Sequence, residues 1–285
     1  MDHTIPVFPH LLLRMTDDFL LITTDKNMST AFMRKMQEGR PKLGVHINGT
    51  KSQTSYSFEL TSDGSIKDTK SLVKQGEHYV FPFAGFLLNV KDCAPQIDYR
   101  RFQGDKALNS LTIGRGPCEG NQFLWRLKTF AKPRCKPILF DSRLNSLEEI
   151  RINFYHVVAF SAIKIKHYVD GMPGRHKQNP RFLAHSCTEL VDYSFNLICS
   201  NLRNVEKAQT NVKELWLSSK WMSKGDATWL GMHAMKNVLL YKNDNFKVVL
   251  RFMTEPKNNT SGSELLDVAQ KALSQFDVKK FSNKK

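Results

Sequence analysis

The chain contains 285 residues, of which 41% are hydrophobic and 24% are charged. This length and composition are typical of one large or two ordinary globular domains, and they exclude wholesale disorder, collagen and coiled-coil arrays. No run of about 18 apolar residues occurs, so the sequence predicts no membrane-spanning helix. The first ten residues have no basic segment before an apolar run, which argues against a secretory signal.

The charge of the chain is strongly positive. Lys and Arg number 42 against 27 Asp and Glu, a formal net charge of +15. Such an excess favours a polyanionic partner, either nucleic acid or an acidic membrane surface, although a basic protein without such a partner also carries it. The cations do not gather on one amphipathic helix, so we expect no membrane partner. The five cysteines contain no Cys-x-x-Cys pair, and they predict neither a disulfide framework nor a zinc site.

The first part of the chain has the pattern of strands and turns. Residues 11–13 and 19–23 are short apolar runs around a polar tip, which predicts a hairpin. Residues 45–47 and 79–90 are further β-rich pieces. The stretch 50–76, rich in Ser, Thr, Lys and Asp, predicts a surface excursion between them.

From about residue 121 the hydrophobic period becomes helical. Ser146 and Glu149 have the pattern of a capping box at the start of a long helix. Three further helix starts are predicted at Asn179-Pro180, Asp226 and Ser263. The predicted fold class is therefore α+β, with residues 1–105 built from β hairpins and residues 106–285 mostly helical.

Asp17 and Asp18 are the sharpest local feature. They lie side by side between two apolar runs, where they repel each other, and a bound divalent cation would explain the placement. Mg²⁺ prefers oxygen ligands and is often held by one or two carboxylates together with substrate phosphates. Paired ions of this kind hold the attacking and leaving oxygens in nucleotidyl transfer. The alternative is an exposed turn, since Asp is a favoured turn residue.

Residues 123–136 interleave aromatic side chains with five cations, which are Arg126, Lys128, Lys132, Arg134 and Lys136. Cations for phosphates, with aromatic side chains packed beneath them, suit a nucleic-acid backbone. A helix with core aromatics on one face and solvated cations on the other explains the spacing equally well.

Several segments resemble telomerase reverse transcriptases, and they follow the order of that family. LLLRMTDDFLLITT, residues 11–24, resembles the motif C hairpin, which carries two of three catalytic aspartates. Residues 39–52 are similar to motif D, and residues 81–88 followed by Asp98 and Tyr99 are similar to motif E, the primer grip. Residues 141–147, Asn153 and Tyr155, and later Trp229, Leu230 and Ala234, resemble the thumb. The motif E and thumb residues favour telomerase over retroelement polymerases.

The resemblance implies a role for each matching residue. Asp17 and Asp18 would be metal ligands, and Lys51 would lie near the phosphates of the incoming nucleotide, unless it is an ordinary surface lysine. The implied primer grip consists of Phe83, Ala84, Gly85 and Phe86, where the family usually has Trp-Cys-Gly. Gly85 would let the primer backbone approach closely, or it is a strand-end glycine.

The implied protein is an RNA-directed DNA polymerase of the nucleus that extends chromosome ends by two-metal nucleotidyl transfer with Mg²⁺. Its partners would be the telomerase template RNA, a telomeric DNA primer, deoxynucleotide triphosphates and the remainder of the telomerase ribonucleoprotein. Sixteen residues precede Asp17 and hold one acid, Asp2, so we expect the third catalytic carboxylate outside this sequence. The chain would then comprise a late palm at residues 1–105 and a thumb at residues 106–285, inactive alone. Alternatives are a non-catalytic module that binds RNA–DNA hybrids and a retroelement polymerase fragment.

Overall fold

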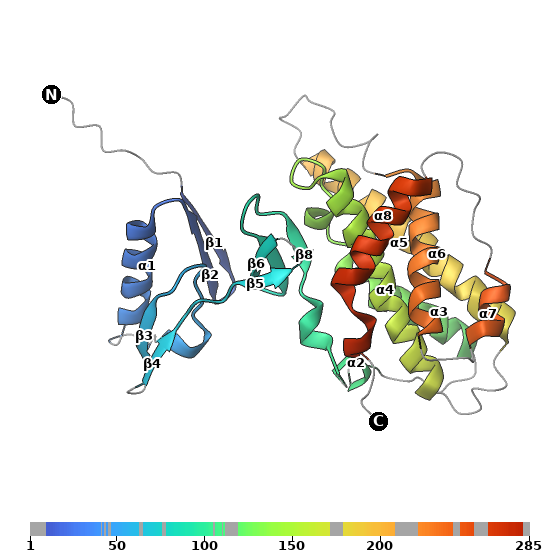
Figure 1. Ribbon diagram of the computed structural model, residues 1–285, viewed down its shortest axis with the longest axis horizontal. Helices are drawn as coiled ribbons and strands as arrows, with labels where there is room; N and C mark the ends of the chain where they lie inside the picture. The colour runs from blue at the N-terminus through green and yellow to red at the C-terminus, as the bar shows by residue number, and fades with distance from the viewer. Residues whose placement is uncertain are drawn as a thin grey trace. The chain divides into compact units, whose positions relative to one another are not determined.

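The computed structural model describes residues 10–40, 42, 44, 47–62, 65–75, 78–104, 106–109, 111, 119–171, 179–208, 222–241, 246–253 and 262–281. The chain forms two compact units, Met1–Asp92 and Cys93–Lys285 (Figure 1). The first contains small antiparallel sheets and the second is mostly helical, so the α+β prediction is confirmed. The assignment of residues 1–105 to a palm and 106–285 to a thumb stays a prediction.

The predicted hairpin at the start of the chain is confirmed. Strands β1 (His10–Met15) and β2 (Asp18–Thr23) pair antiparallel, with Met15 opposite Asp18. Successive side chains of a strand point to opposite faces. Leu11, Leu12 and Leu13 are nevertheless all exposed. Both faces of β1 therefore present apolar side chains to solvent.

Helix α1 (Lys26–Glu38) corrects the prediction that the first part holds only strands and turns. The Asp25 carboxylate caps the helix by accepting the N–H of Asn27 at 2.8 Å. The Tyr56 hydroxyl forms a hydrogen bond of 2.9 Å with the hydroxyl of Ser29 and so ties the following loop to the helix. None of the α1 residues is buried, although Met28, Phe32 and Met36 follow the helical period and are half-buried, so the sequence carried a helical signal here that the prediction did not use.

The polar stretch 50–76 is not the simple surface excursion that the sequence predicted. The short 3₁₀ turn η2 (Gly49–Lys51) begins it, and strands β3 (Glu59–Ser62) and β4 (Ser65–Asp68) form a hairpin within it. Buried hydroxyls of Thr54 and Thr69 hydrogen-bond each other at 2.7 Å, so this part is held by polar contacts that hydrophobic patterning does not detect. Of the β-rich piece predicted at residues 45–47, residues 45 and 46 lie outside the described residues.

Strands β5 (Val73–Gln75), β6 (His78–Phe83) and β7 (Phe86–Asn89) pair antiparallel in a third sheet, and β6 and β7 confirm the β-rich piece predicted at residues 79–90. Val80 and Leu87 supply its buried apolar side chains, and Asn89 is a buried polar residue. This sheet carries the residues that resemble a primer grip.

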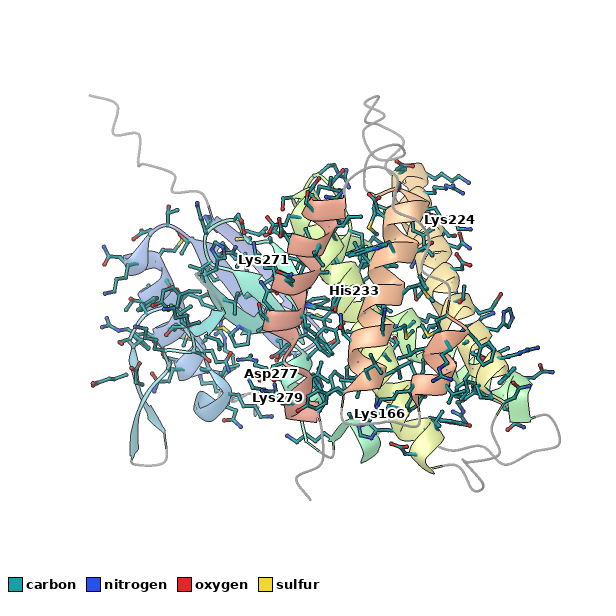
Figure 2. All side chains as sticks on the ribbon, turned by 45° about the vertical axis from the view of Figure 1, so that its right-hand side comes forward. Lys166, Lys224, His233, Lys271, Asp277 and Lys279 are labelled. Carbon is teal, nitrogen blue, oxygen red and sulfur yellow. The ribbon has the colours of Figure 1, made fainter. Side chains whose placement is uncertain are left out.

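The second unit is organised around helix α4 (Leu147–Gly171), which is buried along almost its entire length from Ile150 to Val169. Helices α3 (Glu119–Ala131), α5 (Pro180–Ala208), α6 (Lys224–Leu240) and α8 (Gly262–Phe276) pack against it. Lys271 on α8 and His233 on α6 mark two of these helices in Figure 2. The shorter elements of this unit are β8 (Pro95–Ile97), η3 (Tyr99–Phe102), α2 (Lys106–Asn109), η4 (Lys132–Arg134), η5 (Pro137–Leu139), α7 (Lys247–Arg251) and η8 (Val278–Phe281).

The predicted helix starts are largely confirmed. Ser146 and Glu149 form the capping box, with the Glu149 N–H donating to the Ser146 hydroxyl at 3.2 Å. The cap of α6 is Ser223, whose hydroxyl accepts the N–H of Asp226, and not Asp226 itself as predicted. None of the helices in the described residues is long and apolar enough to cross a membrane.

Ion pairs of the buried Arg151 join three of these helices. Arg151 of α4 has a side chain that is only 7% exposed, and its guanidinium lies 3.2 Å from the Asp226 carboxylate of α6. The same guanidinium also pairs with Glu264 of α8. Because removal of one partner would leave the others without their counter-charge, Arg151 fixes α6 and α8 on α4.

His156 provides a second tie between α4 and α8. Its Nε2–H donates to the carbonyl oxygen of Ala272 at 2.9 Å, and its ring packs on Tyr99 and Phe276. Burial lowers the pKa of His156 from 6.5 to about 4, because the charged imidazolium loses its hydration there.

This lowered pKa predicts acid-sensitive stability. Below pH 6.5 His156 is protonated in the unfolded chain, whereas in the folded chain it becomes protonated only near pH 4. The free energy of unfolding should therefore fall by on the order of 3 kcal/mol from this group between those two pH values, and this contribution should be constant above pH 6.5. Urea unfolding of His156→Gln at a series of pH values should show a shallower acid dependence, whereas His185→Gln, at an exposed position on α5, should keep that of the wild type. Equal acid dependence in all three proteins would contradict the prediction.

Candidate functional site

The two adjacent carboxylates lie at the turn of the β1–β2 hairpin. Thr16 and Asp17 form the turn, Asp18 begins β2, and Thr16 adopts a left-handed backbone with φ +56°. Both aspartates are exposed, and among the described residues neither has an ion-pair partner. Two uncompensated carboxylates on a tight turn offer oxygen ligands of the kind that Mg²⁺ prefers. Among the described residues, however, no group of three side chains is placed to hold a metal ion.

Lys51 lies in the same unit as the two aspartates. It ends the 3₁₀ turn η2, where its N–H donates to the Asn48 carbonyl at 3.1 Å, and its side chain is exposed. No hydrogen bond or ion pair between described residues joins it to Asp17 or Asp18. Lys51 is thus available for a phosphate, and its role stays a prediction.

The four residues that resemble a primer grip form one tight hairpin turn. Phe83 and Phe86 are paired at the ends of β6 and β7, and Ala84 and Gly85 are the two turn residues between them. Their φ values are +48° and +86°, as a type I′ turn requires. The turn therefore requires Gly85 for its backbone conformation, independently of any contact with a primer.

Helix α3 has one buried apolar face and one face open to solvent. Phe123, Leu127 and Ala131 are buried against the rest of the helical unit. Trp125 lies on the opposite face and is 59% exposed, with the Arg126 guanidinium 4.9 Å from the centre of its ring. The solvent face of α3 thus combines an aromatic surface with positive charge.

A second cation–aromatic pair extends this face onto α5. Lys128 Nζ lies 5.5 Å from the ring centre of Tyr193 and 3.4 Å from the Glu189 carboxylate. The Lys128 and Glu189 side chains are 38% and 42% exposed, so water screens this pair and it contributes little to stability. Glu189 and Tyr193 come from a helix distant in sequence, and no sequence pattern singled them out.

The remaining cations of the segment differ in their surroundings. Lys132 and Lys136 are exposed. Arg134 is mostly buried, where its guanidinium donates to the Phe130 carbonyl at 2.6 Å and lies 4.2 Å from the ring centre of Phe160. Burial lowers its pKa. The structure therefore gives Arg134 a packing role, while Lys132 and Lys136 are open to a ligand and Arg126 is partly exposed.

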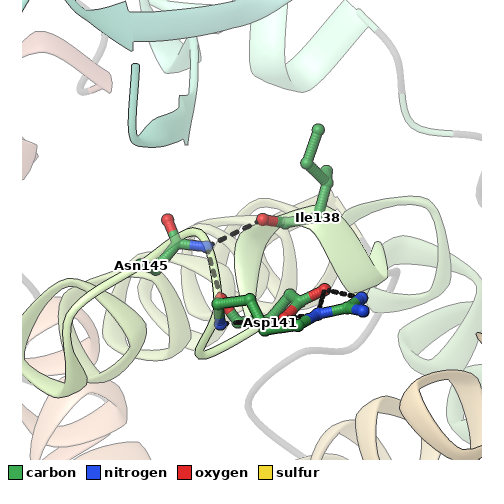
Figure 3. Close-up of polar contacts among 4 residues, drawn as sticks. Ile138, Asp141 and Asn145 are labelled. Carbon is green, nitrogen blue, oxygen red and sulfur yellow. Dashed lines mark hydrogen bonds and ion pairs between the residues drawn. The ribbon is translucent and has the colours of Figure 1, made fainter. Parts of the chain in front are cut away.

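The thumb-like residues 141–147 form the connection that leads into α4 (Figure 3). The Asp141 carboxylate accepts the backbone N–H of Arg143 at 3.0 Å and its guanidinium at 2.6 Å. The Asn145 amide donates to the Ile138 and Asp141 carbonyls at 2.9 and 3.1 Å. Farther along, the Asn153 amide donates to the Pro95 and Leu139 carbonyls. Because these side chains bond to other residues of the helical unit, Asp141, Asn145 and Asn153 have a structural role in it.

Comparison with known proteins agrees with this architecture. Residues 123–254 match the family model described as telomerase reverse transcriptase, C-terminal extension. The chain is 26% identical to the telomerase reverse transcriptase of Arabidopsis thaliana over 255 residues, which are 90% of this chain and 22% of that protein. It is 29% identical over 189 residues to that of Oryzias latipes and 23% identical over 253 residues to that of Canis lupus familiaris. Those alignments cover 66% and 88% of this chain and 17% and 22% of the two relatives.

The chain therefore spans about a fifth of the length of the curated relatives that it matches. It contains a telomerase reverse transcriptase C-terminal extension region and is a distant homologue of telomerase reverse transcriptases over most of its length.

The β6–β7 turn gives a prediction that separates its local role from any contact with a primer. Gly85→Ala places a Cβ at φ +86° and should lower the free energy of unfolding by about 1 kcal/mol. Ala84→Gly relieves the same strain at φ +48° and should cause no loss. Urea unfolding of both variants and the wild type measures the difference. A larger loss for Ala84→Gly than for Gly85→Ala would contradict the turn assignment.

Proposed function

We propose that this chain is the late palm and thumb portion of a telomerase catalytic subunit, an RNA-templated DNA polymerase that adds repeats to chromosome ends in the nucleus. The observation that carries the proposal is the exposed Asp17-Asp18 turn of an apolar hairpin, within a chain whose relatives are telomerase reverse transcriptases. The fold supports this, because a unit of β hairpins precedes the helical C-terminal extension.

In the proposed reaction the 3′-hydroxyl of a DNA primer attacks the α-phosphate of a deoxynucleotide triphosphate. A bond forms between the 3′-oxygen and the α-phosphorus, the bond to the pyrophosphate breaks, and the hydroxyl proton is lost. Bound Mg²⁺ would supply charge stabilisation for the attacking and leaving oxygens. Asp17 and Asp18 would hold the metal, and Lys51 would place a positive charge near the departing pyrophosphate.

The turn and the basic surface would position the nucleic acid. Phe83, Ala84, Gly85 and Phe86 would lie against the primer end, where the absence of a Cβ at Gly85 favours close approach of a backbone. Arg126, Lys128, Lys132, Arg134 and Lys136 were the cations predicted for the RNA–DNA hybrid. Exposure favours Lys132 and Lys136 for direct phosphate contacts, while Arg126 is partly exposed. The exposed ion pair of Lys128 is weak enough to exchange for a phosphate.

Two adjacent carboxylates are fewer than a two-metal site uses in this family, and among the described residues no third metal-ligating side chain joins them. We therefore propose that the 285-residue chain does not extend a primer alone. The template RNA, the telomeric primer, deoxynucleotide triphosphates and the rest of the ribonucleoprotein would be its partners.

A non-catalytic module that binds RNA–DNA hybrids is the second candidate function for this chain by itself. The partly exposed cations Arg126 and Lys128, which lie beside the rings of Trp125 and Tyr193, favour it, since they need no metal to act. The relation to telomerase reverse transcriptases favours a telomerase origin over a retroelement polymerase fragment.

Hybrid binding by the purified chain across a salt series, with primer extension measured alongside, tests the proposal. We expect binding that weakens steeply with salt and no extension. Lys132→Ala and Lys136→Ala should each reduce the slope of log affinity against log salt by about 1, because one phosphate contact is lost. Lys279→Ala, an exposed lysine on η8 (Figure 2), should leave the slope unchanged.

Each other outcome has a definite meaning. Extension by this chain alone would contradict its proposed dependence on a third carboxylate from elsewhere. An absence of hybrid binding even at low salt would contradict the nucleic-acid role. An equal slope change in all three lysine variants would show that net charge, and not the surface at Lys132 and Lys136, carries the binding.

A further inference from the structure

Trp125 is an exposed aromatic side chain that the fold does not use. The buried face of α3 is supplied by Phe123, Leu127 and Ala131, and Trp125 points away from it with 59% of its surface exposed. Large aromatic side chains bury most of their area when they serve packing. Among described residues, Trp125 is also the most exposed of the large hydrophobic side chains. The indole is therefore available to a ligand.

The surroundings of Trp125 are cationic. Arg126 lies 4.9 Å from the ring centre, and Lys132 follows two helical turns later. Trp125, Lys128, Thr129 and Lys132 have three- and four-residue spacing, which places them on one stripe of the α3–η4 segment. Tyr193 adds a second ring beside Lys128. Aromatic rings alternating with cations are the pattern with which proteins bind single-stranded nucleic acid.

The flat indole distinguishes a paired strand from an unpaired one. In a duplex, the faces of each base are covered by its neighbours, and only edges and phosphates are accessible. An exposed ring therefore gains little from the side of a duplex, whereas an unpaired or terminal base can stack on it. A guanidinium next to the ring can hold the phosphate of the same nucleotide.

We propose that Trp125 and Arg126 bind an unpaired nucleotide, with the base stacked on the indole and the phosphate paired with the guanidinium. This inference rests on the proposed function, in which Lys132 and Lys136 contact the hybrid. Trp125 and Arg126, which lie on α3 and precede those lysines, would bind the single strand that continues from the hybrid.

The test compares two ligands with the full chain, a blunt RNA–DNA hybrid and the same hybrid with a short single-stranded extension. Trp125→Ala should weaken binding of the extended hybrid by about tenfold or more and leave the blunt hybrid within about twofold. Trp125→Phe keeps a stacking face and should restore most of the affinity. Leu144→Ala, which removes another exposed apolar side chain of this unit, is the matched control and should change neither. Circular dichroism and urea unfolding of each variant establish that it is folded.

Salt dependence separates stacking from charge. Because stacking releases no counterions, the loss caused by Trp125→Ala should persist at high salt with an unchanged slope, whereas Arg126→Ala should reduce the slope by about 1 for the extended hybrid.

The other outcomes overturn the inference in distinguishable ways. Equal weakening of both hybrids would make Trp125 a general duplex contact, and the proposed function would stand. No weakening of either would mean that Trp125 serves another ligand, such as a protein partner, and again the proposed function would stand. Failure of the wild-type chain to bind either hybrid would overturn the inference and the proposed nucleic-acid role together.

Discussion

Burial of α4 on nearly all sides is the constraint on which the helical unit depends. A helix that is apolar around its circumference must be covered completely, and α3, α5, α6 and α8 do this. The polar groups that α4 carries must then find partners inside the protein. Arg151 pairs with carboxylates of α6 and α8, the Asn153 amide reaches two carbonyls, and His156 donates to Ala272. The bonds of Arg151 and His156 tie α6 and α8 to α4, and those of Asn153 tie β8 and η5 to it.

The outward face of α3 follows from this arrangement. Once Phe123 and Leu127 are committed to the core, the helical period turns Trp125, Lys128 and Lys132 to the opposite side. Helix α5 packs beside α3 and contributes Tyr193 and Glu189 to the same surface. The proposed nucleic-acid surface is therefore a consequence of how the core is filled.

The first unit, in contrast, leaves apolar side chains exposed to solvent. The β1–β2 hairpin exposes Leu11, Leu12 and Leu13, although a two-stranded sheet is only marginally stable by itself. A larger palm sheet would cover these side chains, and the same sheet would supply the third carboxylate that the proposed reaction uses. The exposed leucines and the two-aspartate turn are independent observations, and both support the proposal that this unit is part of a polymerase palm.

The sequence predicted the elements whose signal is local. The β1–β2 hairpin, the capping box at Ser146 and the helix start at Asn179 each depend on residues a few positions apart, and the structure confirms them. Helix α1 was missed although Met28, Phe32 and Met36 follow the helical period, and the β3–β4 hairpin was missed because it lies in a stretch of mostly polar residues.

For the candidate site, too, the sequence predicted only what depends on residues close together in the chain. Local spacing could name Asp17, Asp18 and the cations of residues 123–136. It could not tell that Arg134 turns inward onto Phe160 while Trp125 turns outward, because that depends on helices that are distant in sequence.

The most direct test of the account maps where a primer lies. An RNA–DNA hybrid with a photoreactive base at the primer 3′ end, and another with one at the far end of the duplex, would be cross-linked to the chain and the linked peptides identified. The account predicts that the 3′ terminal base links to the turn at residues 83–86 and the duplex to residues 123–136. Cross-links confined to other surfaces would contradict it.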